Sequence, residues 1–176
     1  MNIFRLIKAL LIGFTGLFVV LTLFSLLIPS TVKLSRATVI NKASAPEVYN
    51  LLADLRNWKN WHPVFKSDSA VIKYSSGKDC VIHYNGISSR LRITSVDSNS
   101  IKFFVATASE TDILNELGIT SLPNQDAVQV EWRVINKLRW YPWEKLYGIF
   151  LDNISGPGYE LALNELKVFF ESNRSR

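Results

Sequence analysis

Residues 9–28 form a run of twenty amino acids without a charged side chain. An α-helix rises about 1.5 Å per residue, so a helix of this length spans roughly 30 Å, the thickness of a bilayer's hydrocarbon core. The alternative, a cleaved secretory signal, has an apolar region of about 7 to 15 residues that ends at a small-residue cleavage site. Here the run continues into Leu27-Ile28-Pro29-Ser30. The sequence therefore predicts an uncleaved transmembrane anchor in residues 1–30 and one further domain in residues 31–176.

Basic residues flank the predicted anchor on both sides. Arg5 and Lys8 precede it, and Lys33, Arg36 and Lys42 follow it. The two sides nearly balance, but short basic N-terminal tails usually stay in the cytoplasm. We therefore expect a single-pass membrane protein whose C-terminal domain lies outside the cytoplasm.

The charge of the domain argues against a nucleic-acid partner. The chain has 20 basic and 15 acidic residues, and two of the basic residues, Arg5 and Lys8, belong to the anchor. The remaining excess of positive charge is small and forms no block of like charges, whereas nucleic-acid-binding surfaces usually need a clustered basic patch. The single cysteine, Cys80, excludes an intrachain disulfide and a cysteine-rich zinc site.

The first part of the domain predicts a strand followed by two short helical segments. Residues 31–41 are rich in β-branched side chains and favour a strand that begins directly after the anchor. Ser44 and Glu47 have the spacing of a capping box, at the start of a short helix that ends near Asp54. Residues 55–63 contain two tryptophans three positions apart before a proline, which indicates one further helical turn.

An antiparallel meander is expected next, because several β-rich segments are separated by turn residues. These segments are 70–74, 79–84, 88–96, 100–107 and 126–135. Their alternation predicts one polar face, which includes His83, and one apolar face that another element must cover. The apolar face would carry Cys80, Ile82, Tyr84, Leu91, Ile93, Ile101, Phe103, Val105, Val128, Val130, Trp132 and Val134.

Residues 141–172 repeat apolar side chains at helical spacing and predict the helix that covers this face. Gly156-Pro157-Gly158 interrupts the pattern, so we expect the helix to break or kink there. Residues 108–124 follow no clear period. We interpret them as a long connection, with a possible helical turn at 112–117, that acts as a lid.

The order of these elements resembles the helix-grip fold, an α+β arrangement in which a curved antiparallel sheet wraps around a long C-terminal helix. The run Thr38–Pro63, TVINKASAPEVYNLLADLRNWKNWHP, resembles the opening of the START-like superfamily, also called SRPBCC. This superfamily includes polyketide cyclases, dehydratases and lipid-transfer domains. The later run Leu138–Trp143 resembles membrane-anchored bacterial members. The resemblance implies the fold more strongly than an activity, because enzymes, carriers and sensors share this scaffold.

A helix-grip fold implies a cavity between the sheet and the last helix, and the many aromatic residues suit an apolar ligand. We therefore expect a hydrophobic small molecule, such as a lipid or a quinone-like or polyketide-like compound. The candidate ligand-binding residues are Tyr84, Phe103, Trp132, Phe150, Tyr159, Leu163 and Leu166. The side chains that could instead fill the core are Phe103, Trp132, Phe150 and Tyr159. Trp58 and Trp61 are expected to plug the space between helices and sheet, and Trp140 and Trp143 suit the membrane interface.

Catalytic residues are harder to find in this sequence. Its two histidines lack a metal-ligand pattern: we expect His62 to cap a turn or meet solvent, and His83 to lie on the outer face. No HExxH, P-loop, GxGxxG or GxSxG motif occurs, so no catalytic residue, metal or cofactor is predicted.

Two alternatives to a binding protein stay open. A cyclase or dehydratase would have to use Tyr84, Cys80 or the lid residues Glu110 and Asp112, whereas an interaction module would have a core filled by its own side chains. An open apolar cavity favours binding, charged groups inside it favour an enzyme, and a packed interior favours the interaction module. The oligomeric state does not follow from the sequence.

Overall fold

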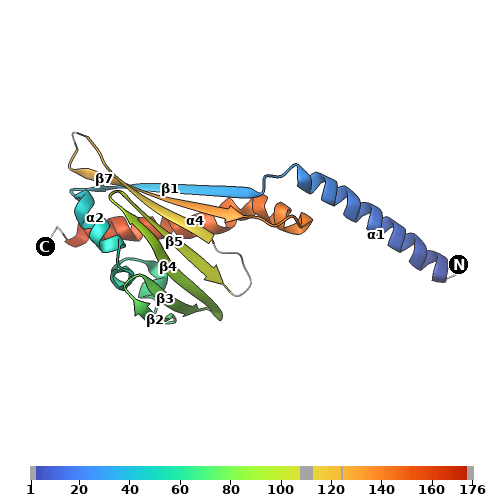
Figure 1. Ribbon diagram of the computed structural model, residues 1–176, viewed down its shortest axis with the longest axis horizontal. Helices are drawn as coiled ribbons and strands as arrows, with labels where there is room; N and C mark the ends of the chain where they lie inside the picture. Colours follow the sequence, from blue (N-terminus) through green and yellow to red (C-terminus); the bar gives the residue numbers. More distant parts are fainter. Residues whose placement is uncertain (1–2, 108–112, 124, 174–176) are drawn as a thin grey trace.

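The computed structural model describes residues 3–107, 113–123 and 125–173. Its helical elements are α1 (Ile3–Leu26), α2 (Ala45–Leu52), η1 (Leu55–Asn60), α3 (Pro63–Lys66) and α4 (Pro142–Asn173). Its strands are β1 (Thr31–Asn41), β2 (Val71–Ser76), β3 (Asp79–Tyr84), β4 (Ile87–Asp97), β5 (Ser100–Thr107), β6 (Ile113–Ser121) and β7 (Ala127–Lys137). The helix α1 projects away from one end of the domain (Figure 1).

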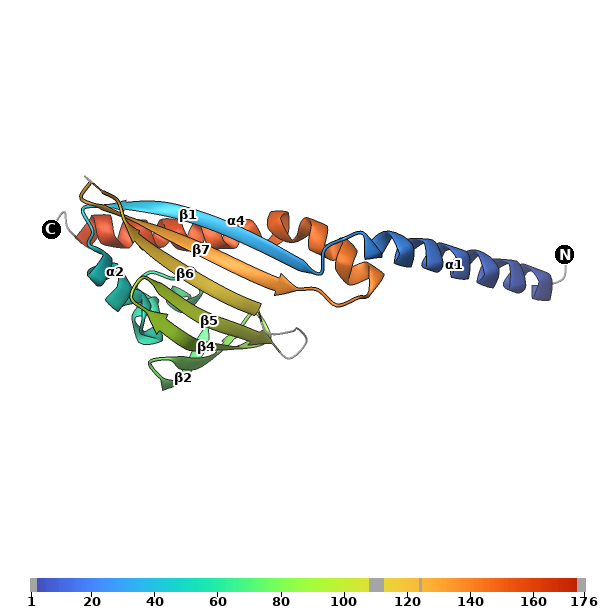
Figure 2. The ribbon, with the colours of Figure 1, turned by 45° about the horizontal axis from the view of Figure 1, so that its top comes forward.

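The seven strands form one antiparallel sheet in the order β1-β7-β6-β5-β4-β3-β2. Strands β2 to β7 follow each other as a meander, and β1 pairs with β7 along its whole length, from Thr31 opposite Lys137 to Asn41 opposite Ala127. The sheet curves around α4 (Figure 2). The predicted α+β helix-grip architecture is therefore confirmed.

The core lies between the concave face of the sheet and the helices. Every residue predicted for the apolar face is buried, apart from Tyr84 and Val105, which are partly buried. Trp58 and Trp61 are fully buried beneath this face, as expected for a plug, and the indole Nε1 of Trp58 donates a hydrogen bond of 3.0 Å to the carbonyl oxygen of Leu52. His83 is exposed on the outer face, as predicted.

The prediction that residues 108–124 form a long connection with a helical turn is wrong for residues 113–121. Residues 113–121 are strand β6, which pairs with both β5 and β7 in the interior of the sheet. Its inward positions are Ile113, Asn115, Leu117 and Ile119, so a polar side chain interrupts an otherwise apolar alternation. Residues 108–112 lie outside the described part of the chain, and Glu110 and Asp112 with them.

The helix α4 is one continuous element and does not break at Gly156-Pro157-Gly158. Proline has no amide hydrogen, so Pro157 leaves the carbonyl oxygen of Asn153 without its helical donor. The guanidinium of Arg36, from β1, lies against Gly156 and binds Asp152 on one side of the proline and Glu160 on the other. The ribbon of α4 bends in its orange first half (Figure 2).

The junction between α1 and the domain is short and held by a buried lysine. Only residues 27–30 separate the end of α1 from β1. The Nζ of Lys145, from α4, donates hydrogen bonds to the carbonyl oxygen of Ile28 (2.8 Å) and to the Oγ of Ser30 (2.7 Å). Lys145 is only 5% exposed. The expectation of a strand directly after the apolar segment is met, with α4 fixing the connection.

Candidate functional site

A cavity of about 490 Å³ lies between the concave sheet face, η1, α3 and α4, and we call it the main cavity. Its lining is dominated by aromatic and aliphatic side chains, and none of the described lining residues is charged. The lining residues are Trp58, His62, Val64, Phe65, Ile82, Tyr84, Asn85, Ile87, Ser89, Leu91, Phe103, Val105, Ile113, Asn115, Trp132, Ser155, Gly158 and Tyr159.

The structure brings together four of the seven predicted ligand-binding residues: Tyr84, Phe103, Trp132 and Tyr159 line the main cavity. Leu163 and Leu166 do not line it but are buried in the core. Phe150 is 57% exposed. The reason is the phase of α4: Leu151 faces the domain, and Phe150 is turned from it by about 100°. Ligand contact by the four lining residues stays a prediction.

The prediction that His62 caps a turn or meets solvent is met only in part. His62 precedes α3 as its N-cap residue, but its side chain makes no capping hydrogen bond. His62 is partly buried, and it lines the main cavity. Burial lowers the pKa of His62 from its ordinary 6.5 to about 4, so the imidazole is neutral near pH 7.

Aromatic rings hold the imidazole of His62 in place. The Trp58 ring stacks on it, with centroids 5.4 Å apart and planes 16° from parallel. Trp61 and Phe65 meet it edge to face at 5.2 Å each, and Trp132 approaches to 6.0 Å. The Nδ1 of His62 is buried without a hydrogen-bond partner among the described residues. Packing between η1, α3 and β7 creates this cluster, and no local sequence pattern announces it.

A second polar feature of the lining joins β6 to β7. The indole Nε1 of Trp132 donates a hydrogen bond of 2.9 Å to the Oδ1 of Asn115, whose Nδ2 donates to the carbonyl oxygen of Ile113 at 3.1 Å. Asn115 is only 1% exposed, so this pairing satisfies polar atoms that water does not reach. Asn115, Leu117 and Ile119 occupy every second position. This two-residue period was the signal that could have identified both β6 and the inward amide of Asn115.

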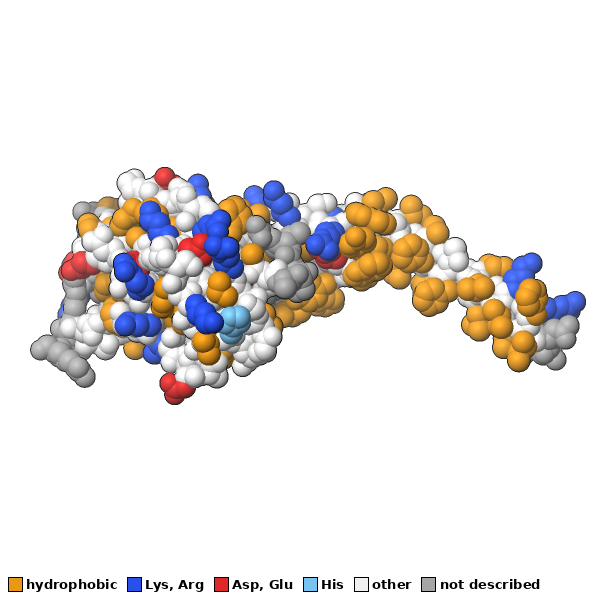
Figure 3. Space-filling model, turned by 60° about the horizontal axis from the view of Figure 1, so that its bottom comes forward, with side chains coloured by type: hydrophobic (Ala, Val, Ile, Leu, Met, Phe, Trp, Pro, Cys, Tyr) orange, Lys and Arg blue, Asp and Glu red, His pale blue; other side chains and the backbone are white. Residues whose placement is uncertain are grey.

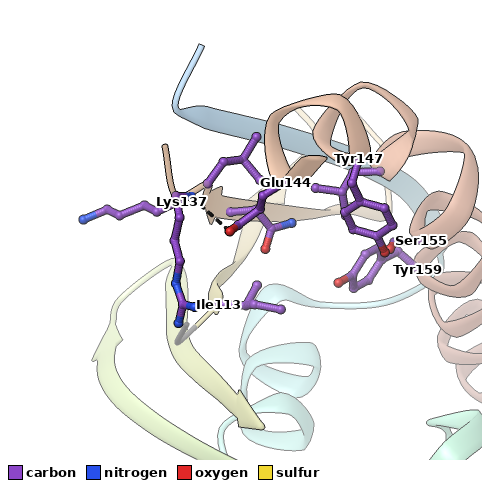
Figure 4. A pocket seen from close by; sticks show the side chains of 10 residues that line it. Ile113, Lys137, Glu144, Tyr147, Ser155 and Tyr159 are labelled. Atoms are coloured by element: carbon purple, nitrogen blue, oxygen red, sulfur yellow. Dashed lines mark hydrogen bonds between the residues drawn. The ribbon is translucent and has the colours of Figure 1, made fainter. Parts of the chain in front are cut away.

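A smaller cavity of about 260 Å³ adjoins the main cavity near the start of α4, and we call it the vestibule. It shares Ile113, Ser155 and Tyr159 with the main cavity but is more polar. Tyr147, Ser155 and Tyr159 group on its helix side, away from Lys137 (Figure 4). The backbone N–H of Arg139 donates a hydrogen bond of 2.9 Å to the Oε1 of Glu144. The vestibule's remaining lining residues are Asn136, Leu138 and Leu151.

The described residues place only two of the groups that a cyclase or dehydratase was expected to use, Cys80 and Tyr84. Cys80 is buried and absent from the lining of the main cavity, and burial raises the pKa of its thiol to about 12, so the reactive thiolate is suppressed. Tyr84 does line the cavity. Glu110 and Asp112 lie outside the described residues. Within the described residues, no three His, Cys, Asp or Glu side chains are grouped so that they could hold a metal ion.

Solved structures share this fold at low sequence identity. A START superfamily protein from Mycobacterium smegmatis matches with a TM-score of 0.61 and 15% identity, over 80% of this chain and 98% of its own. The protein XoxI from Bacillus cereus gives 0.60 and 14%, over 81% and 98%. The di-domain ARO/CYC protein StfQ, from the steffimycin biosynthetic pathway, gives 0.61 and 11%, over 83% of this chain and 53% of its own. No protein-family model and no curated protein matches the sequence. The chain therefore has the START-like helix-grip fold.

Proposed function

We propose that this START-like chain is a membrane-anchored binding protein for a hydrophobic small molecule, held in the main cavity between the sheet and α4. The observation that carries the proposal is the main cavity itself, about 490 Å³ with a mainly apolar lining. Small-molecule sites are typically concave, mostly apolar and roughly 300–1,000 Å³ in volume. An interaction module with a filled core would not need such a space. A lipid, a quinone-like or a polyketide-like molecule has the matching chemistry.

Residues 1–30 act, in this proposal, as the membrane anchor, and residues 31–176 as the binding domain. The helix α1 is long and apolar enough to cross a bilayer, and nearly all of its length is exposed. A signal sequence would share these properties. The contacts of the buried Lys145 with Ile28 and Ser30 favour the anchor, because a retained segment keeps these hydrogen bonds. The domain is proposed to lie outside the cytoplasm.

The first half of α4 supports contact with the bilayer surface. Its exposed apolar side chains, together with that of Trp140, form what we call the juxtamembrane face: Trp140, Trp143, Leu146, Tyr147, Ile149, Phe150 and Ile154. Hydrophobic side chains gather where the domain meets α1 (Figure 3). Aromatic rings of this kind favour the headgroup layer. Tyr147 also lines the vestibule, so a ligand from the bilayer would have a short path inward.

The test is whether the full chain, purified in detergent, carries a hydrophobic molecule that native mass spectrometry or organic extraction detects. The cavity-filling variant is Gly158→Phe, because Gly158 lines the main cavity and an added Cβ there meets no atom within 4 Å. Val168→Phe is the matched control, on an exposed position of the same helix. We expect Gly158→Phe to lose most of the copurified ligand and Val168→Phe to keep it. Equal ligand content in both variants would contradict the proposal.

A further inference from the structure

The imidazole of His62 is a polar group in the main cavity that the protein itself leaves unused. Its Nδ1 has no hydrogen-bond partner among the described residues. Trp61 Nε1 is also unpaired, but Trp61 does not line the cavity. A buried polar group without a partner opposes folding, so such groups are rare unless a ligand, ion or water completes them. Because Nδ1 itself is covered by protein atoms, a ligand in the main cavity would reach the imidazole at its other nitrogen, Nε2, which no described residue engages.

A second polar side chain of the lining, that of Asn115, is already committed. Asn115 accepts from Trp132 and donates to the carbonyl oxygen of Ile113. Its pairing holds Trp132, which in turn packs 6.0 Å from the His62 ring. Asn115 thus helps to position the imidazole instead of competing with it for a ligand.

The geometry around His62 fixes the direction of any hydrogen bond that it makes. Trp58 stacks on one face of the ring, and Phe65 meets it edge to face. Trp58 is itself held by its bond to the carbonyl oxygen of Leu52. A group held by its neighbours before the ligand arrives loses little conformational freedom on binding, which favours affinity and selectivity.

We propose that His62 is the polar recognition residue of the main cavity, and that its ligand is a neutral, largely apolar molecule bearing a hydroxyl or carbonyl group that hydrogen-bonds to the imidazole. The inference rests on the proposed function and names the ligand's chemical class. A neutral imidazole offers one donor and one acceptor, which a hydroxyl matches in either sense and a carbonyl matches through the donor. An ionised head group would find no charged partner among the described lining residues of this cavity.

The experiment compares two probes of nearly equal shape, 2-naphthol and 2-methylnaphthalene, which differ in a hydroxyl and a methyl group. Their affinities for the full chain in detergent are measured by tryptophan fluorescence, with protein-free micelles as the partition control. The quantity of interest is the ratio of the two affinities. We expect His62→Phe to lower the preference for 2-naphthol by roughly tenfold, the effect of one buried hydrogen bond, with little change for 2-methylnaphthalene. His62→Gln, which keeps a hydrogen-bonding group, should recover part of the preference.

His83→Phe is the matched control, because the second histidine is exposed on the outer face of the sheet and should leave the ratio unchanged. A measurement on the wild type guards against misfolded variants: in ¹⁵N-histidine NMR spectra, 2-naphthol should shift the ring signals of His62 and 2-methylnaphthalene should not. Binding of both probes with the same ratio in wild type and His62→Phe overturns the role of His62 and leaves the proposed function standing. Binding of neither probe by the wild type overturns both.

Discussion

Trp132 links the sheet, the helix and the cavity through a single side chain. It is only 4% exposed, contacts Tyr159 of α4 with ring centroids 5.1 Å apart, and bonds to Asn115. We predict that Trp132→Ala lowers the free energy of unfolding by roughly 3–5 kcal/mol, as truncation of large core aromatics does. Chemical unfolding followed by circular dichroism measures this. Trp140→Ala is the control: its side chain is 64% exposed, so stability should hardly change.

His62 also predicts how stability depends on pH. Its pKa is about 4 in the folded protein, against 6.5 for an ordinary histidine, because burial disfavours the charged ring. Between these values the unfolded chain binds more protons than the folded one. Stability is therefore complete above pH 6.5 and decreases as the pH falls toward 4, by at most roughly 3 kcal/mol. Unfolding curves at several pH values should show this decrease in the wild type and not in His62→Phe.

The acidic side chains act in a separate pH window. Hydrogen bonds from Arg90 lower the pKa of Asp79, and those from Arg56 lower the pKa of Asp54, from an ordinary 3.8. Their contribution is present above that value and is lost as the pH falls through the lowered pKa values. A decrease in stability between pH 6.5 and 4 that persists in His62→Phe would contradict the assignment to His62.

For single residues, the sequence predicted the face of the sheet on which a side chain lies better than it predicted the role of that side chain. Alternation placed Phe103 and Trp132 on the buried face, because the two-residue period of a strand depends only on local geometry. It could not place His62, whose environment is assembled from η1, α3 and β7, segments that lie far apart along the chain. The neighbouring Pro63 suggested a turn at the surface, and a turn does exist there, but the helices and sheet enclose it.

Among the elements, α4 stays a single helix through Pro157, and a side chain of strand β1 binds it on both sides of the proline. Arg36 of β1 binds Asp152 and Glu160 across Pro157. We predict that Arg36→Gln raises hydrogen-exchange rates of the backbone amides in residues 152–160 while leaving the midpoint of global unfolding nearly unchanged, since these ion pairs are solvent-exposed. Mass spectrometry after deuterium labelling measures it. Arg92→Gln, which disrupts a pair with Asp79 at another place, should leave that segment's exchange rates as they are.

Strand β6 and helix α4 explain where element prediction failed. In β6, the inward Asn115 and the small Gly118 obscured the apolar alternation, yet Asn115 is needed there to pair Trp132. In α4, glycine and proline signalled a break or a kink; the helix stays continuous through Pro157, and its first half bends (Figure 2). The error in β6 arose at a position where a partner from another strand overrides the local preference of the chain.

For the whole molecule, the orientation of the domain is open to a direct test. Ser172, near the end of α4, is exposed, whereas Cys80 is buried with a thiol pKa raised to about 12. The thiol of Cys80 should therefore not react with a membrane-impermeant maleimide. We predict that Ser172→Cys is labelled on intact cells and that the wild type is not. Labelling of Ser172→Cys only after lysis would place the domain in the cytoplasm.

The juxtamembrane face predicts a second property of the whole molecule, its affinity for lipid. A chain that begins at Leu27 keeps the partners of Lys145 but lacks α1. Provided that circular dichroism shows it folded, we expect it to cosediment with lipid vesicles, and Trp140→Ser with Trp143→Ser to weaken this by roughly tenfold through lost apolar contact. The matched control replaces two exposed apolar residues, Val71 and Tyr74, with serine. Both belong to β2, the edge strand at the other end of the sheet from β1. Equal losses in both pairs would contradict a specific face.

The four-residue junction limits how far the binding domain can travel. Fully extended, residues 27–30 would reach at most about 14 Å, and Lys145 already ties down two of them. If α1 is embedded as proposed, the domain stays at its own membrane and does not shuttle between membranes. Encounters with ligand then become a search in two dimensions, governed by the ligand's density in the bilayer and by lateral diffusion. If the ligand is passed on, the receiving protein or membrane has to come to the anchored domain.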